Sequence, residues 1–87
     1  MTLTAQNLVR HELTGMEVEV VISKDPNKIG IKGVVVEESK NLLTIKTSKN
    51  ETKIPKKECV FRFKLGGQKI DINGEKLVGR PEDRIKR

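Results

Sequence analysis

The stretch KIPKKECVFRFKL, residues 53–65, places a basic run directly before the only two aromatic residues of the chain, Phe61 and Phe63. Lysine and arginine bind phosphates, and rings on an exposed sheet face can stack on RNA bases. Alternate residues of a strand point to opposite faces, however. The inward set would be Cys59, Phe61, Phe63 and Leu65, and the outward set Val60, Arg62 and Lys64. Because no other aromatic residue can fill a core, we expect the rings inside and the basic residues outside.

Enzyme chemistry is poorly supported by the remaining polar residues. The chain has one histidine, His11, and one cysteine, Cys59, far apart in the sequence. The pairs Glu37-Glu38 and Glu82-Asp83 fit solvated charge better than a magnesium site, and a zinc site needs about four Cys or His ligands. We therefore expect no catalytic residue, no metal site and no cofactor in this chain.

Composition favours an anionic partner. Eighteen Lys and Arg against twelve Asp and Glu give a net charge of +6, and the excess lies beyond residue 23. Such a basic chain is expected to bind nucleic acid, although lysine runs on small domains are often only solubilising surface. No apolar run approaches the length of about 20 residues that a membrane helix needs, and the start of the chain does not read as a signal peptide. We expect a cytoplasmic protein without membrane contact.

The residues before 16 have the signature of a short helix. Thr4 can cap it, and Leu3 with Leu8 can form a hydrophobic staple. Leu8, Val9 and Leu13 would make a narrow apolar stripe. Because this stripe is too small to fold alone, the helix must dock on the domain itself or on a partner.

From Met16 onward the apolar period changes to two, which is typical of strands with one buried face. Short turns separate the expected strands, so neighbours should pair antiparallel, and Asn73-Gly74 reads as a two-residue hairpin turn. Pro81 can start a short C-terminal helix. The expected strands cover residues 16–23, 29–39, 42–48, 51–55, 59–65, 68–72 and 75–79.

These elements predict a mainly β fold, a small Sm-like or SH3-like antiparallel barrel of five or six strands with a short N-terminal helix. Closing the sheet would remove exposed edges. A single domain covers residues 1–87: a helical arm at 1–15, the barrel at 16–79, and a basic C-terminal tail or helix at 80–87.

Six segments in order resemble the archaeal ribonuclease P protein component 1 family. They are HELTG (11–15), VEVV (18–21), GIKGVVVEE (30–38), LTIKT (43–47), IPKKECVFRFKL (54–65) and INGEKLVGRPEDRIKR (72–87). The resemblance implies an Sm-like barrel that serves as an accessory subunit in 5′ leader removal from precursor tRNA. It also implies that the RNA subunit carries the catalytic magnesium, and that a small zinc-ribbon subunit, which holds the zinc, is the protein partner.

On this interpretation the chain is a non-catalytic part of an endoribonuclease, monomeric when isolated. It would contact ribonuclease P RNA, other ribonuclease P proteins and, indirectly, precursor tRNA. Leu8, Val9 and Leu13 would belong to the protein interface. The expected RNA-binding residues are Arg10, Lys32, Lys56, Lys57, Arg62, Arg80, Arg84, Lys86 and Arg87.

Two other functions remain open from the sequence. One is an Sm-type RNA-binding homo-oligomer, although the uridine-binding signatures of that family are not evident. The other is an SH3-like protein that binds ribosomal RNA.

Overall fold

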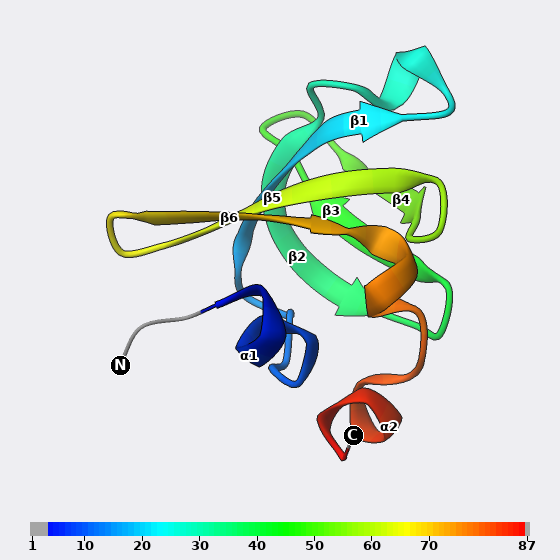
Figure 1. Cartoon of the computed structure of the whole chain (residues 1–87). Helices are drawn as coiled ribbons and strands as arrows, with labels where there is room; N and C mark the ends of the chain where they lie inside the picture. The colour runs from blue at the N-terminus through cyan, green and yellow to red at the C-terminus, as the bar shows by residue number, and fades with distance from the viewer. Residues whose placement is uncertain (1–3, 87) are drawn as a thin grey trace.

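The computed structural model describes residues 4–86 and consists of one curved antiparallel sheet with short helices at both ends of the chain (Figure 1). The hydrogen-bonded strand order is β4-β3-β2-β1-β5-β6, so β4 and β6 are the two ends of the sheet. The strands are β1 (Glu17–Ser23), β2 (Lys32–Glu38), β3 (Leu42–Lys46), β4 (Glu51–Pro55), β5 (Cys59–Leu65) and β6 (Gln68–Asn73). The helical elements are α1 (Ala5–Val9), η1 (Pro26–Lys28), η2 (Gly74–Leu77) and α2 (Pro81–Ile85). The predicted mainly β fold of the Sm-like class, with a helix near each terminus, is confirmed.

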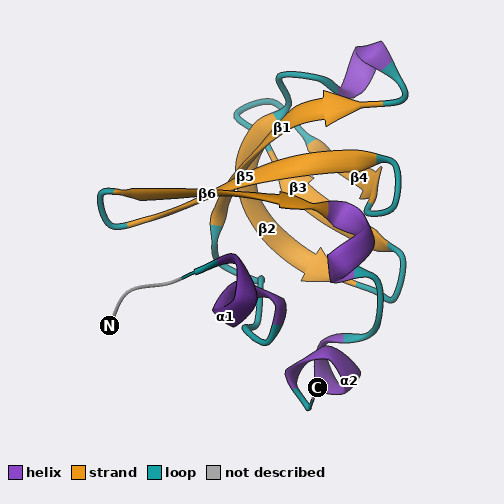
Figure 2. Ribbon diagram, in the orientation of Figure 1, coloured by secondary structure: helices purple, strands orange, loops and turns teal. Residues whose placement is uncertain are grey.

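The sheet bends around its own apolar face, with the helices outside it (Figure 2). Register shifts fall between Val20 and Ile22 in β1 and between Val35 and Glu37 in β2, and such bulges increase strand bending. Gly33 serves a different purpose, since a Cβ there would lie 1.9 Å from the carbonyl oxygen of Lys46 on β3. Gly33 therefore permits the close approach of β3, while the bulge of β2 lies between Val35 and Glu37.

Phe61 and Phe63 fill the centre of the core, as predicted. Their exposed fractions are 0% and 1%, and the ring centroids are 6.2 Å apart. Cys59 is buried beside them, whereas Leu65 is 48% exposed because it ends β5 at the turn into β6. The expected inward position of Leu65 is therefore wrong, whereas Phe61 and Phe63 build the core and are not available for base stacking.

The predicted Asn73-Gly74 hairpin is wrong. Asn73 instead caps the 3-10 turn η2, its side chain accepting a hydrogen bond from the Glu75 backbone N–H at 3.0 Å. Gly74 is buried against the turn between β4 and β5, where a Cβ would lie 1.7 Å from the carbonyl oxygen of Lys56. Glycine is needed here for close packing, and residues 75–79 do not form the strand expected there.

The N-terminal helix docks on the domain itself. Thr4 caps α1 through a 3.1 Å hydrogen bond from the Asn7 N–H, as expected, whereas the staple residue Leu3 lies outside the described part of the chain. Leu8 and Leu13 are fully buried in the core. The apolar stripe therefore packs on the domain itself.

Candidate nucleic-acid interface

The structure divides the nine predicted RNA-binding residues into four groups. Two are buried, one is half-buried and ion-paired, five are exposed, and Arg87 lies outside the described residues. The buried pair is Lys56 and Arg84, and the half-buried residue is Arg62. The exposed residues are Arg10, Lys32, Lys57, Arg80 and Lys86.

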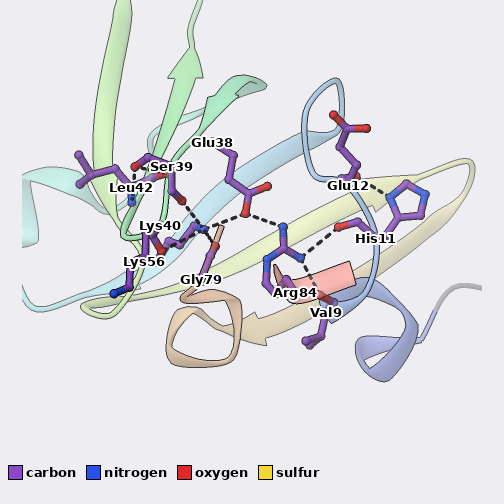
Figure 3. Close-up of polar contacts among 10 residues, drawn as sticks. All are labelled: Val9, His11, Glu12, Glu38, Ser39, Lys40, Leu42, Lys56, Gly79 and Arg84. Carbon is purple, nitrogen blue, oxygen red and sulfur yellow. Dashed lines mark hydrogen bonds and ion pairs between the residues drawn. The ribbon is translucent and has the colours of Figure 1, made fainter. Parts of the chain in front are cut away.

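Lys56 does not present its charge to solvent, so its predicted contact with phosphates is wrong. Its side chain is 0% exposed, and its ammonium donates to Glu38 Oε2 at 2.7 Å (Figure 3). The carbonyl oxygens of Ser39, Lys40 and Gly79 accept from the same ammonium at 2.7, 3.4 and 3.1 Å. Lys56 therefore ties the β4–β5 turn to the β2–β3 turn and to the segment before α2.

Arg84 is the second correction. Its side chain is also 0% exposed and pairs with Glu38 Oε2 at 2.5 Å. Its other terminal nitrogen donates to the carbonyl oxygens of Val9 and His11 at 2.6 and 3.1 Å. This guanidinium joins α2 to the chain segment after α1 and is inaccessible to RNA in this conformation.

Glu38 is the centre of this ionic cluster, which we define as Glu38, Lys56 and Arg84. One oxygen, Oε2, receives both cations, while Glu38 Oε1 and Arg84 Nε have no hydrogen-bond partner within the described residues. Burying charges costs desolvation free energy, which only close pairing and further hydrogen bonds offset. Removing Glu38 would leave two buried cations without a carboxylate, whereas removing one cation would leave the other paired with Glu38.

Leu8 and Leu13 were expected at a protein interface, and that expectation is wrong. Both side chains are 0% exposed because they pack in the core of this chain. Val9 is half-buried and packs against the same core. The α1 stripe is therefore an internal contact, with only part of Val9 reaching the surface.

Arg62 lies on the outer face but is paired. Its guanidinium donates to both carboxylate oxygens of Asp71 on β6, at 2.7 and 3.1 Å. This hydrogen bond is the main reason why the pKa of Arg62 is raised and the pKa of Asp71 is lowered from their ordinary values. A phosphate would have to compete with Asp71 for this side chain.

The outer face around Arg62 carries alternating charges. In the strand registers Lys32 lies opposite Glu19, Glu19 lies opposite Arg62, and Arg62 lies opposite Asp71. This row across β2, β1, β5 and β6 has no net charge. Opposite charges on facing strands stabilise a sheet, so the row has a structural reason to exist.

A hollow of about 310 Å³ lies on the same face of β1 and β2. Its lining includes the carboxylates of Glu17 and Glu19 as well as Lys32 and Lys64. Because the carboxylates would repel phosphates, Lys32 and Arg62 lie in a poor setting for RNA binding.

Four exposed basic residues lie on chain segments that hydrogen bonds bring together. The Gly79 N–H donates to the Lys40 carbonyl at 2.8 Å, which brings Arg80 beside the β2–β3 turn. The two hydrogen bonds from Arg84 bracket Arg10, and Lys86 follows on the same segment. We call Arg10, Lys40, Arg80 and Lys86 the terminal basic surface; all four are exposed.

Acidic residues also occur on these segments, where Glu12, Glu82 and Asp83 are exposed. Glu82 and Asp83 lie in the first turn of α2, where carboxylates favour the helix N-terminus. Lys57 is exposed in the β4–β5 turn, next to Glu58 and outside the terminal basic surface.

The chain matches a known family over residues 6–87, described as "Ribonuclease P/MRP, subunit p29". The chain belongs to this family. It is 48% identical over 86 residues to ribonuclease P protein component 1 of Methanosphaera stadtmanae, and the match covers 98% of this chain and 92% of the relative. The protein of the same name from Methanocaldococcus jannaschii is also 48% identical, covering 98% and 90%. The resemblance found in the sequence is thereby confirmed.

A solved structure supports the p29 assignment at the level of the fold. Mth11, described as a homologue of the human RNase P protein Rpp29, superposes with a TM-score of 0.62 at 40% sequence identity. The match covers 86% of this chain and 99% of Mth11. As a p29 family member the chain is a subunit of ribonuclease P, which supports that function over an Sm-type ring or a ribosomal protein.

Sequence reasoning missed Lys40, a member of the terminal basic surface. It also placed Lys56 at the surface, although strand periodicity could have shown that Lys56 points inward. Lys40 lies in a turn outside the basic run, and only the folded chain brings it beside Arg80. Lys56 lies two residues after the buried Ile54, so extending the period of two beyond Pro55 would have pointed its side chain inward. No comparable signal marks Arg84.

Two further findings concern the described part of the chain. Residues 4–86 contain no helix that is both long and apolar enough to cross a bilayer. The same residues contain no group of three or more His, Cys, Asp or Glu placed to hold a metal ion.

Proposed function

We propose that this p29 subunit binds the RNA of archaeal ribonuclease P through the terminal basic surface and holds that RNA in its active shape. The observation that carries the proposal is the convergence of Arg10, Lys40, Arg80 and Lys86 from three segments of the chain. Family membership supplies the identity of the RNA.

The proposed mechanism is electrostatic. Each lysine or arginine that meets a phosphate releases condensed counterions, which favours binding without reading the base sequence. With both rings in the core, base stacking has no role. We propose that Lys57 adds a contact outside the terminal basic surface, and that Lys32 and Arg62 contribute less because Glu19 and Asp71 neutralise them.

The chemistry of leader removal is proposed to belong to the RNA subunit and its magnesium. The chain would act with a zinc-ribbon protein subunit, which would hold the zinc, and with other ribonuclease P proteins. Contact with precursor tRNA would be indirect. We further propose a cytoplasmic protein that is monomeric when isolated.

Reconstitution tests the proposal. Precursor-tRNA cleavage by the RNA subunit is measured at limiting magnesium, with and without this chain and its zinc-ribbon partner. The expected result is faster cleavage with the pair than with the partner alone, because neutralised phosphates let the RNA fold at lower magnesium. An unchanged rate would overturn the proposed function.

A further inference from the structure

The C-terminal helix is held to the domain by a polar anchor. Among the residues of α2, Arg84 is the one that is buried, while Ile85 is 46% exposed. A helix of five residues is far too short to be stable in isolation. The orientation of α2 therefore depends on what Arg84 contacts.

Arg84 in turn depends on a single carboxylate. Glu38 Oε2 lies 2.5 Å from Arg84 and 2.7 Å from Lys56, and the Glu38 side chain is 0% exposed. Through Arg84 it fixes α2 against the carbonyl groups on either side of Arg10, and through Lys56 it fixes Gly79 and the β2–β3 turn. All segments that carry the terminal basic surface are thus connected to one acidic residue.

We propose that Glu38 is a positioning residue for RNA binding: it arranges the terminal basic surface although it carries the same charge sign as the RNA and is buried. This inference rests on the proposed function. Without the carboxylate, the segments around residues 10, 40, 80 and 86 lose their common anchor. Each basic side chain would then have to be ordered when RNA binds, which lowers affinity.

A charge argument makes the proposal testable, because the two possible effects have opposite signs. Removing an acidic residue makes the protein more positive, so simple electrostatics predicts equal or tighter RNA binding. Loss of positioning predicts weaker binding. Glu38→Gln therefore separates the two, and Glu37→Gln is the matched control, an exposed residue of β2 with the same change in charge.

The measurement is the affinity of the full chain for a transcript of archaeal ribonuclease P RNA at fixed salt. For Glu38→Gln we expect binding about tenfold weaker, corresponding to the ordering of one or two side chains. For Glu37→Gln we expect unchanged or slightly tighter binding. Equal behaviour of the two variants, with Glu38→Gln still folded, would overturn the proposal.

A second variant keeps the test decisive if Glu38→Gln fails to fold. Arg84→Met releases α2 while leaving Glu38 paired with Lys56, so the ionic cluster stays balanced in charge. Lys69→Met is its control, since it removes one positive charge from an exposed position of β6. Because Arg84 is buried, loss of a phosphate contact cannot explain weaker RNA binding by Arg84→Met. We expect Arg84→Met to weaken RNA binding several-fold more than Lys69→Met does. An equal loss of affinity in the two variants would count against positioning.

Hydrogen exchange and a surface variant complete the experiment. In Arg84→Met the hydrogen-bonded amides of Asp83 and Arg84 should lose protection while those of β1 and β5 keep it, and retained protection at these two amides would refute the anchor. The double variant Arg80→Ala with Lys86→Ala tests the surface itself. If it binds RNA normally, the proposed function is wrong; if it binds weakly while Glu38→Gln and Arg84→Met match their controls, only the positioning role is wrong.

Discussion

At the scale of single residues, charge type did not reveal what each basic side chain does. Lys56 and Lys57 are neighbours of the same type, yet Lys56 is 0% exposed with four acceptors and Lys57 is exposed. The difference comes from strand parity and from Glu38 on another strand. A lysine pair in a sequence can therefore combine a structural residue with a surface residue.

This contrast predicts different outcomes for the two alanine variants. Lys56→Ala should lower the free energy of unfolding by about 1–3 kcal/mol, because the carbonyl oxygens of Ser39 and Gly79 lose their buried hydrogen-bond donor. Lys57→Ala should change stability by less than about 0.5 kcal/mol. Urea denaturation of both variants checks this, and similar midpoints would show that Lys56 is not buried in solution.

The Arg62–Asp71 pair predicts a defined pH effect. The guanidinium keeps the pKa of Asp71 below its ordinary value, so the pair stabilises the fold above the unfolded-state pKa of Asp71, and that contribution is lost as the pH falls through the lower folded-state value. The exposure of both side chains keeps the contribution small.

Arg62→Ala should raise the pKa of Asp71 toward the ordinary value of an aspartate. A carboxyl-detected NMR titration measures the shift directly, and Lys64→Ala on the same strand is the control. An unchanged Asp71 titration in Arg62→Ala would mean that the pair does not persist in solution.

At the scale of elements, strand periodicity located the sheet well but not its exceptions. Alternation placed Cys59, Phe61 and Phe63 in the core correctly. The bulge between Val35 and Glu37 could not be predicted from the sequence. It shifts the alternation of β2 by one residue just before Glu38. Likewise Asn73-Gly74 is compatible with both a hairpin turn and a capped 3-10 turn. The packing of Gly74 against the backbone of Lys56 favours the 3-10 turn.

Gly74 provides a test of that packing. Gly74→Ala should lower the free energy of unfolding by about 1–3 kcal/mol, because the new methyl group collides with a backbone carbonyl that cannot move freely. Gly67→Ala is the matched control, since a Cβ added there would meet no atom within 4 Å. Thermal unfolding compares the two, and equal stability would contradict the close approach.

At the scale of the whole molecule, the net charge is +6, and charges are arranged differently in the row around Arg62 and in the terminal basic surface. The charges of Lys32, Glu19, Arg62 and Asp71 cancel across four strands, whereas the residues of the terminal basic surface are exposed. Composition alone predicted an anionic partner but could not locate the contact, because pairing across strands depends on register.

This distribution predicts where the salt dependence of RNA binding arises. Arg80→Ala with Lys86→Ala should reduce the slope of log affinity against log salt by about 1.5–2, one counterion-release contribution per lost phosphate contact. Lys49→Ala with Lys53→Ala removes the same charge from exposed positions at the β3–β4 turn and strand β4 and should change the slope less. Equal changes in slope would indicate diffuse binding over the whole surface.

The ionic cluster also has a consequence for the order of folding events. The hydrogen bond from Arg84 to Val9 joins residues 75 positions apart, farther than any strand pairing in the sheet, since the longest, β1–β5, spans up to 47 positions. Contacts between distant residues carry the larger loop-closure entropy, so we expect α2 to dock after the sheet has formed. Substitutions at Arg84 should then accelerate unfolding and leave the refolding rate almost unchanged. The end of the molecule assigned to RNA binding would be the last part to fold and the first to open.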